Sequence, residues 1–198
     1  VWAMDEAQPR RVMVGHLADV DCVAWHPNTN YIATGSSDRT VRLWDVQTGD
    51  CVRIFTGHRA GVRSLAMSPD GKSMASGSDD GGVLVWDLAT AKCSHAFEGH
   101  RGAVYSLDYS HGAGTVLASG GADETVKVWD VSQSASAEVN GGEAGAAAGE
   151  SKAATAARKP PMTSLRTKST PVFNVQFTGR NLLMAMGARA PSVRSQVA

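Results

Sequence analysis

The sequence has no long hydrophobic run and no net charge, and each absence excludes a class of protein. No apolar segment of its 198 residues approaches the roughly 20 residues that a membrane-spanning helix needs. Lys and Arg number 19, as do Asp and Glu, so the formal net charge is zero. This balance argues against a protein surrounded by a field that attracts nucleic acid. The N-terminus lacks a basic segment followed by an apolar one, so no signal peptide is predicted.

Cysteine is scarce as well. Cys22, Cys51 and Cys93 are widely spaced, odd in number and form no CxxC motif. A disulfide framework and a zinc knuckle are therefore excluded, and a reducing compartment is expected. Each cysteine lies in an apolar, β-rich stretch and is predicted to be a small buried residue. The sequence predicts no metal and no cofactor.

Acidic residues are absent from the last part of the chain. Residues 1–150 hold 19 acidic and 11 basic residues, whereas residues 151–198 hold eight basic residues and no acidic one. Two parts of opposite charge are therefore joined. Because the chain begins at Val1 with a segment typical of the middle of a strand, we expect a piece of a longer polypeptide.

An internal repeat is what the sequence does contain. Gly-His recurs at a spacing of 42 residues, and Trp-Asp follows each Gly-His 28 or 29 residues later. Short segments such as residues 41–44 alternate apolar and polar residues, and turn signals such as Pro69-Asp70-Gly71 separate them. This pattern predicts four strands per unit and no long helix. The dipeptides are Gly15-His16, Gly57-His58, Gly99-His100, Trp44-Asp45, Trp86-Asp87 and Trp129-Asp130.

A unit of this length from Gly-His to Trp-Asp resembles the WD40 repeat of β-propellers. The resemblance implies an all-β fold of four-stranded antiparallel blades, each of which buries its apolar faces against its neighbours. WD40 rings most often have seven blades, so this chain would hold about four blades of an incomplete propeller. In this family the terminal blade is completed by strands from the start of the domain.

The repeat also predicts where the blades begin and end. Residues 1–14 are expected to supply the last two strands of one blade, and residues 170–188 the first two strands of the terminal blade. In that terminal segment, residues 172–177 align with residues 104–109. Between them we predict full repeats at 15–56, 57–98 and 99–131, a flexible Ala/Gly-rich insertion and basic linker at 132–169, and, at the end, a disordered tail at 189–198.

A set of His, Ser or Thr, Asp and Trp recurs in each unit as a candidate site. These residue types also form hydrolytic triads, but three identical copies indicate structural units rather than three active sites. The resemblance implies a buried hydrogen-bond chain from the Asp through the His and the hydroxyl to the indole N–H. The sets are His16, Thr34, Asp38 and Trp44; His58, Ser76, Asp80 and Trp86; and His100, Ser119, Asp123 and Trp129.

No motif predicts catalysis. Gly71-Lys72-Ser73 resembles the end of a phosphate-binding loop, but the glycine required five residues earlier is replaced by Ala66. We therefore predict no catalytic residues and no small-molecule substrate. Side chains beside the repeated framework change chemistry from unit to unit, as expected on a face that binds partners. The residues predicted for that face are Arg39, Arg59, Arg63, Arg101 and Tyr105; ordinary solvated charge is the alternative.

The acid-free part begins with Arg158-Lys159-Pro160-Pro161 and continues through Arg166 and Lys168. Four basic residues over this length fit a nuclear-import patch or an arm that contacts phosphate, and equally a solvated linker. Thr170-Pro171 is a candidate phosphorylation site of low specificity.

Residues 1–58 resemble the WD40 domain of the WD-repeat subunit of transcription factor TFIID, the TBP-associated factor 5 family. The more discriminating part is TKSTPVFNVQFTGRNLLMAMGA at residues 167–188, where a Thr-Lys-Ser-Thr-Pro strand and a Phe-Thr-Gly-Arg-Asn-Leu turn match that family. The resemblance implies a nuclear, non-catalytic scaffold in RNA polymerase II initiation. Its partners would be histone-fold TBP-associated factors, with little direct nucleic-acid contact and no membrane contact.

Other assignments stay open from the sequence. A WD40 adaptor of a SAGA-type acetyltransferase, a substrate receptor of a ubiquitin ligase, and a subunit of an RNA-processing complex share the same repeat. An F-box upstream of this chain would indicate the ligase, and salt-sensitive RNA binding would indicate the RNA-processing complex.

Overall fold

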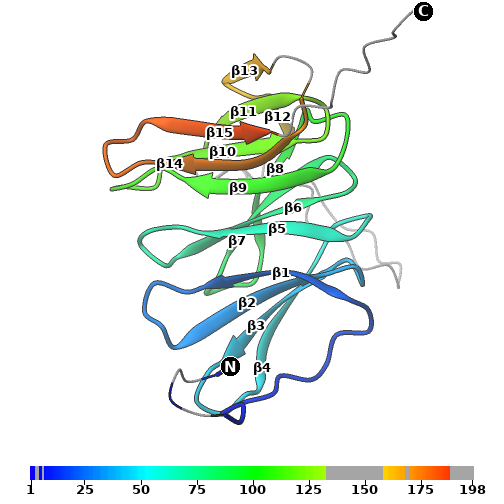
Figure 1. The fold of residues 1–198 in the computed structure, drawn as a ribbon, viewed down its shortest axis with the longest axis vertical. Coiled ribbons are helices and arrows are strands. Elements are labelled where there is room, and N and C mark those ends of the chain that lie inside the picture. Colours follow the sequence, from blue (N-terminus) through cyan, green and yellow to red (C-terminus); the bar gives the residue numbers. More distant parts are fainter. Residues whose placement is uncertain (3–4, 6, 133–157, 168–169, 188–198) are drawn as a thin grey trace, which may run out of the picture.

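The computed structural model describes residues 1–2, 5, 7–132, 158–167 and 170–187, and over these residues the fold is all-β. Strands gather into sheets that stack face to face along the long axis of the molecule (Figure 1). This is the arrangement of an incomplete β-propeller, as predicted. In the described ranges, no helix is long and apolar enough to cross a membrane.

The first two repeats each form a four-stranded antiparallel unit in chain order. Their alternating apolar residues face the neighbouring sheets, as on β3, where Val41 and Leu43 are buried. The strands are β1 (Val20–Trp25), β2 (Tyr31–Ser36), β3 (Thr40–Asp45) and β4 (Cys51–Thr56), then β5 (Val62–Met67), β6 (Ser73–Ser78), β7 (Gly82–Asp87) and β8 (Cys93–Glu98).

The third blade corrects the predicted repeat boundaries. Strands β9 (Val104–Tyr109), β10 (Val116–Gly121) and β11 (Thr125–Asp130) lie within the predicted unit, but the fourth strand is β13 (Thr163–Arg166). Val126 pairs with Leu165, so β13 follows the insertion instead of preceding it. The predicted unit 99–131 is nine residues shorter than the spacing of 42, and it lacks a fourth strand.

The return of the chain from the insertion is also ordered, contrary to the predicted linker. Strand β12 (Arg158–Lys159) pairs in parallel with β8 and makes the second sheet five-stranded. Pairing here covers the outer edge of β8, which would otherwise expose unpaired backbone groups. Residues 133–157, 168–169 and 188–198 lie outside the described residues, and with them most of the predicted insertion and the predicted tail.

Two strands lie in the terminal segment, and none lies at the N-terminus. Strands β14 (Val172–Phe177) and β15 (Leu183–Gly187) form a two-stranded sheet. None of the described residues among 1–14 lies in a strand, although two strands are predicted there. The amine of Val1 donates instead to the carbonyl of Arg11. The two outer strands of a blade need the inner strands of that blade as pairing partners. Without them they form an isolated hairpin, which is only marginally stable in water.

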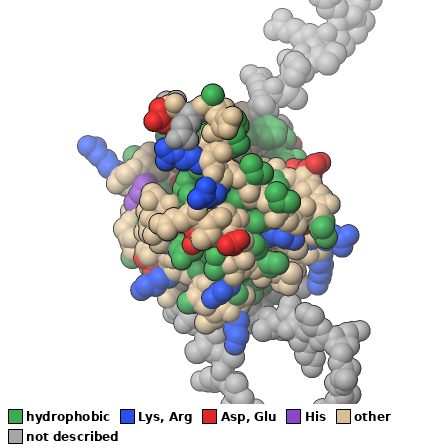
Figure 2. Space-filling view, turned by 90° about the horizontal axis from the view of Figure 1, so that it is seen from below, with side chains coloured by type: hydrophobic (Ala, Val, Ile, Leu, Met, Phe, Trp, Pro, Cys, Tyr) green, Lys and Arg blue, Asp and Glu red, His purple; other side chains and the backbone are tan. Residues whose placement is uncertain are grey.

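The hydrophobic core lies between the sheets rather than within them. Phe55 packs on Trp86 across the first interface, with ring centroids 5.5 Å apart, and Phe97 stacks on Trp129 across the second at 4.9 Å. Val172 and Val175 continue the core into the terminal sheet. Seen from the first-blade end, hydrophobic side chains lie among polar and basic ones (Figure 2). On β1, Val20, Val23 and Trp25 are more than half exposed, because no further sheet covers them.

Substitution Phe97→Ala tests the importance of these interfaces. The ring is 1% exposed and stacks on Trp129, so its loss should lower the free energy of unfolding by about 3–5 kcal/mol. Ile54→Ala is the control, because Ile54 is 50% exposed, and it should cost less than about 1 kcal/mol. Urea unfolding followed by tryptophan fluorescence measures both. Equal effects of the two substitutions would contradict a core located between the sheets.

Candidate functional site

The recurring His, hydroxyl, Asp and Trp side chains meet in all three repeats. In the first, Trp44 Nε1 donates to Thr34 Oγ1 over 2.8 Å, and His16 Nε2 lies 2.7 Å from the same oxygen. His16 Nδ1 lies 2.8 Å from Asp38 Oδ2. The third repeat has nearly the same geometry, with His100 Nδ1 2.9 Å from Asp123 Oδ1. Each of these hydrogen-bond chains connects the segment before a blade to the middle strands of that blade.

These contacts fix which atoms donate. A carboxylate only accepts, so His Nδ1 must carry the proton that is shared with the Asp. In a neutral imidazole, Nε2 then accepts from the hydroxyl, whose oxygen accepts in turn from the indole N–H. In the first and third repeats every polar atom of the hydrogen-bond chain therefore has a partner, which is the condition under which a buried network stabilises a fold.

The electrostatics agree with this arrangement. Burial lowers the pKa of His100, although Asp123 opposes the shift, so the neutral imidazole is favoured. Burial works against ionisation of Asp123, but hydrogen bonds from His100, the Arg101 amide and Thr125 outweigh it and hold the pKa of this carboxyl below its usual value. The Asp is therefore a charged acceptor in the folded protein.

The same geometry argues against catalysis by these sets. Ser76 and Ser119 are fully buried, and the hydroxyl of each accepts from a tryptophan. A nucleophilic serine needs an open path to its substrate, which these residues lack. Across the residues placed by the structure, no group of three or more His, Cys, Asp or Glu could hold a metal ion. The three cysteines are free, and burial raises the pKa of Cys22 to about 12.

The second repeat departs from the other two. Thr40 and Thr125 each donate to the Asp of their set, over 2.6 and 2.8 Å, but Gly82 stands at the equivalent position. The Asp80 carboxylate still accepts hydrogen bonds from the backbone amides of Arg59 and Gly82. His58 Nδ1, however, lies 3.7 Å from that carboxylate. The Asp80 side chain is 20% exposed, against 7% and 8% for its two counterparts.

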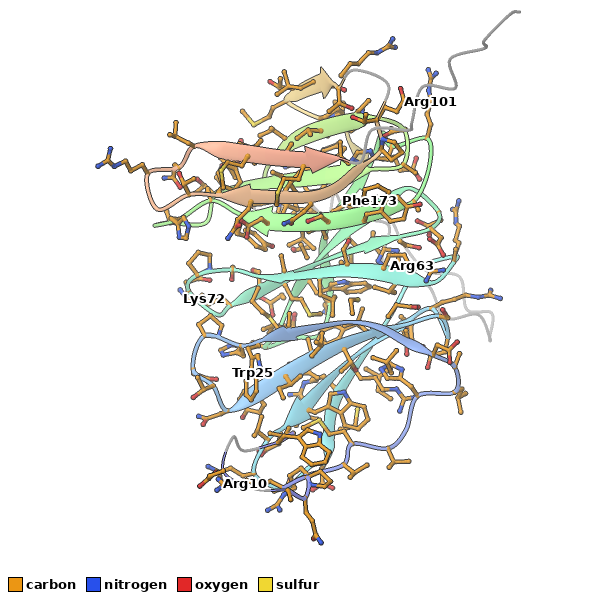
Figure 3. The ribbon with its side chains drawn as sticks, in the orientation of Figure 1. Arg10, Trp25, Arg63, Lys72, Arg101 and Phe173 are labelled. Atoms are coloured by element: carbon orange, nitrogen blue, oxygen red, sulfur yellow. The ribbon has the colours of Figure 1, made fainter. Side chains whose placement is uncertain are left out.

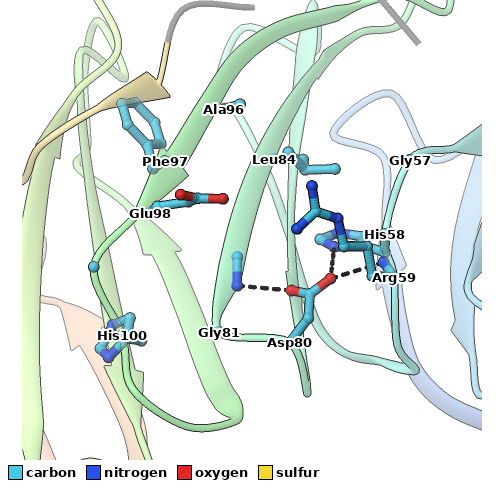
Figure 4. Close-up of a pocket in the computed structure, with 12 residues that line it drawn as sticks. Gly57, His58, Arg59, Asp80, Gly81, Leu84, Ala96, Phe97, Glu98 and His100 are labelled. Carbon is cyan, nitrogen blue, oxygen red and sulfur yellow. Dashed lines mark hydrogen bonds and ion pairs between the residues drawn. The ribbon is translucent and has the colours of Figure 1, made fainter. Parts of the chain in front are cut away.

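A cavity of about 450 Å³ opens at this place. Asp80 lies on one wall, and Phe97 and Glu98 lie on the facing strand (Figure 4). Gly81 has a φ of +77°, and a Cβ there would lie 2.6 Å from the His100 carbonyl. Arg39 and Glu124 occupy the same left-handed position in the other turns, so only the second repeat requires glycine there. The sequence signal for this departure is Gly81-Gly82 where the other repeats have Arg39-Thr40 and Glu124-Thr125.

The residues predicted for a partner face divide into two groups. Arg59 and Arg101 are exposed in the segments that precede the second and third blades, and Arg39 is exposed in the turn between β2 and β3. Arg63, in contrast, bridges two blades, because its guanidinium donates to Asp21 and to Asp79 over 2.9 to 3.0 Å. Figure 3 shows Arg63, Arg101 and Phe173 on one side of the molecule and Lys72 on the other.

Phe173 belongs to this face and was not among the predicted residues. It stacks on Tyr105 with ring centroids 5.3 Å apart, and half of it is exposed. In the alignment of residues 172–177 with residues 104–109, Phe173 takes the position of Tyr105. The sequence therefore contained the signal that Phe173 belongs to this face. In the other repeats a His five residues earlier marks this position. The terminal segment has Lys168 in place of that His.

Comparison with known proteins supports the repeat assignment. The family profile described as "WD domain, G-beta repeat" matches residues 7–45, 49–87 and 91–130. Transcription initiation factor TFIID subunit 5 of Caenorhabditis elegans is 49% identical over 49 residues, which are 25% of this chain and 8% of that protein. Eukaryotic translation initiation factor 3 subunit I of Aspergillus terreus is 58% identical over 38 residues, which are 19% of this chain and 11% of that protein.

Solved structures show the same fold over a larger part of the chain. The structure titled "Crystal structure of RRP9 WD40 repeats" has a TM-score of 0.67 and 25% identity. The match covers 83% of this chain and 44% of that one. "Structure of U3-55K" matches with the same TM-score and coverage at 24% identity. The chain thus spans less than half of these structures and a small part of the curated relatives.

Substitution Gly82→Thr tests the departure of the second repeat. A Cβ at Gly82 would lie 2.8 Å from Asp80 Oδ1, so the carboxylate must rotate, after which the new hydroxyl can donate to it as Thr40 does. We expect the free energy of unfolding to rise by about 0.5–1.5 kcal/mol. Thr125→Gly is the matched reverse change and should lower it by a similar amount. Urea unfolding measures both, and a loss of stability in Gly82→Thr would refute the account of this cavity.

Proposed function

The chain belongs to the WD40 repeat family, and from this premise we propose that it is part of a non-catalytic scaffold subunit of TFIID that assembles TBP-associated factors. WD40 repeats generally serve as scaffolds, and the buried hydroxyls of Ser76 and Ser119 support a structural rather than a chemical role here. The proposal places the protein in the nucleus and its partners among the histone-fold TBP-associated factors.

The observation that carries the proposal is the length of the TFIID match. One repeat of this chain spans about 42 residues, and the shared framework of Gly-His and Trp-Asp accounts for matches that are confined to one unit. The match to TFIID subunit 5 extends over 49 residues, beyond a single unit. The terminal segment at 167–188, which resembles the same family, adds support that is independent of the repeated framework.

A second candidate function is a subunit of a translation initiation factor. The 58% identity to eukaryotic translation initiation factor 3 subunit I favours it, although that match covers 38 residues and thus a single repeat. Both candidates are scaffolds in which partners bind the exposed face beside the turns. They differ in the partner, so one binding experiment separates them.

The partner face that we propose consists of Arg39, Arg59, Arg101, Tyr105 and Phe173. These side chains are exposed at the same end of successive blades, and three of the five are arginines. We assign Arg63 a different role, because its two carboxylate partners hold neighbouring blades together.

Binding of purified partners tests the proposal. The full-length protein should retain a purified heterodimer of histone-fold TBP-associated factors on an affinity resin, and should not retain purified subunits of translation initiation factor 3. The double variant Arg39→Glu with Arg59→Glu should weaken retention about tenfold or more, since it reverses two exposed charges at the face. Lys72→Glu with Lys92→Glu, on the opposite side, should leave it unchanged. Retention of the translation factor subunits alone would overturn the TFIID assignment.

A further inference from the structure

Lys127 is a buried cation without a buried anion to pair with. It lies on β11 and is 7% exposed, and its Nζ donates to Ser164 Oγ over 3.0 Å. In the described part of the chain it forms no ion pair, so a hydroxyl is its one hydrogen-bond partner. The side chain also lines a cavity, so its two remaining N–H donors are open to water or to an acceptor that enters the cavity.

Lys127 lines a cavity of about 380 Å³ that contains further donors. Arg101 and Arg166 line the same cavity and are exposed to solvent. Ser164 accepts from Lys127, so its own hydroxyl hydrogen remains available to donate. Two acidic residues, Asp123 and Glu124, also line the cavity, and Asp123 accepts hydrogen bonds from His100, Thr125 and the Arg101 amide.

The second repeat builds the same cavity with different chemistry. Strand register makes Leu84 and Ala96 the counterparts of Lys127 and Ser164, since each pair lies side by side on the third and fourth strands of its blade. By the same register, Glu98 is the counterpart of Arg166. One framework thus carries an acidic cavity in the second blade and a basic one in the third. The fold does not require a lysine at position 127, since leucine occupies its place 43 residues earlier.

We propose that the cavity of the third blade binds the phosphoryl group of a phosphoserine or phosphothreonine side chain on a partner protein. A phosphoryl group carries about −1.5 to −2 charges at neutral pH and presents three acceptor oxygens. Guanidinium groups bind it bidentately, and a buried ammonium adds a charge that water screens weakly. Lys127, Arg101 and Arg166 supply this combination, with the Ser164 hydroxyl as a fourth donor.

The surroundings favour a protein-borne phosphate over the backbone of a nucleic acid. Nucleic-acid binding requires cations spread along several successive phosphates, whereas here three cations line one cavity. Residues 15–130, which contain strands β1 to β11, hold 14 acidic against nine basic residues. The inference does not rest on the proposed TFIID role, because the cavity shares only Arg101 with the proposed partner face and its test needs no TFIID subunit.

A short synthetic peptide is the probe. Binding of fluorescein-labelled Gly-Gly-pSer-Gly-Gly to the full chain is measured by fluorescence anisotropy, beside the same peptide with Ser or Glu in place of phosphoserine. Lys127→Leu introduces the residue of the second repeat, and Arg166→Glu reverses an exposed charge. Each should weaken binding of the phosphopeptide by about tenfold, the loss expected for one charge-assisted contact. Lys127→Arg, which repeats Arg42 of the first blade, should retain it.

Folding and nonspecific charge are controlled separately. Lys127→Leu removes a buried charge and should not lower the melting temperature, whereas a lysine with a purely structural role would lower it when replaced. Arg180→Glu makes the same charge reversal in the turn between β14 and β15 and should leave affinity within about twofold. Equal loss in Arg180→Glu, equal binding of the Glu peptide, or displacement of the phosphopeptide by an equimolar single-stranded oligonucleotide would each overturn the proposal. So would the absence of saturable binding by the unaltered chain.

Discussion

The structure depends on one constraint: a sheet of four short strands cannot bury both its faces by itself. Each blade therefore needs a neighbour, and the large buried rings of Phe55 and Trp86, and of Phe97 and Trp129, lie where neighbours meet. The repeat of 42 residues meets this requirement, because similar units form similar sheets whose apolar faces pack against one another. At β1, where no sheet follows, Val23 and Trp25 remain exposed.

Within this stack, the buried hydrogen-bond chains set the positions of the turns, and small departures from them create the sites. Gly82 removes one hydroxyl from the set around Asp80, whose carboxylate then lies 3.7 Å from His58 Nδ1. Lys127 leaves its own blade's chain intact but places an ammonium beside it. A framework that is fixed by many shared contacts can thus vary one position at a time, which explains how repeats of one fold carry different surface chemistry.

Much of this fold can be predicted from the sequence, because Gly-His precedes the first strand and Trp-Asp ends the third strand of each of the three blades. The hydrogen-bonded sets follow from the same register, as does the place of Phe173. Strand β13 could not be found in this way, since Leu165 and its neighbours are followed by Lys168 rather than by the Gly-His that marks the other units. Its pairing with β11 is decided by tertiary structure, across an insertion with no periodicity of its own. The basic cavity was missed for the same reason, since two of its donors, Ser164 and Arg166, lie on that strand.

The central claim is therefore that the third blade is completed by a strand from beyond the insertion, and that this strand builds one wall of the basic cavity. Hydrogen–deuterium exchange of the backbone amides tests it most directly. In the register of β13 on β11, the paired amides of residues 163–166 should exchange as slowly as those of β8, the fourth strand of the second blade. Exchange of residues 163–166 at the rate of an unstructured peptide, while β8 remains protected, would contradict the claim.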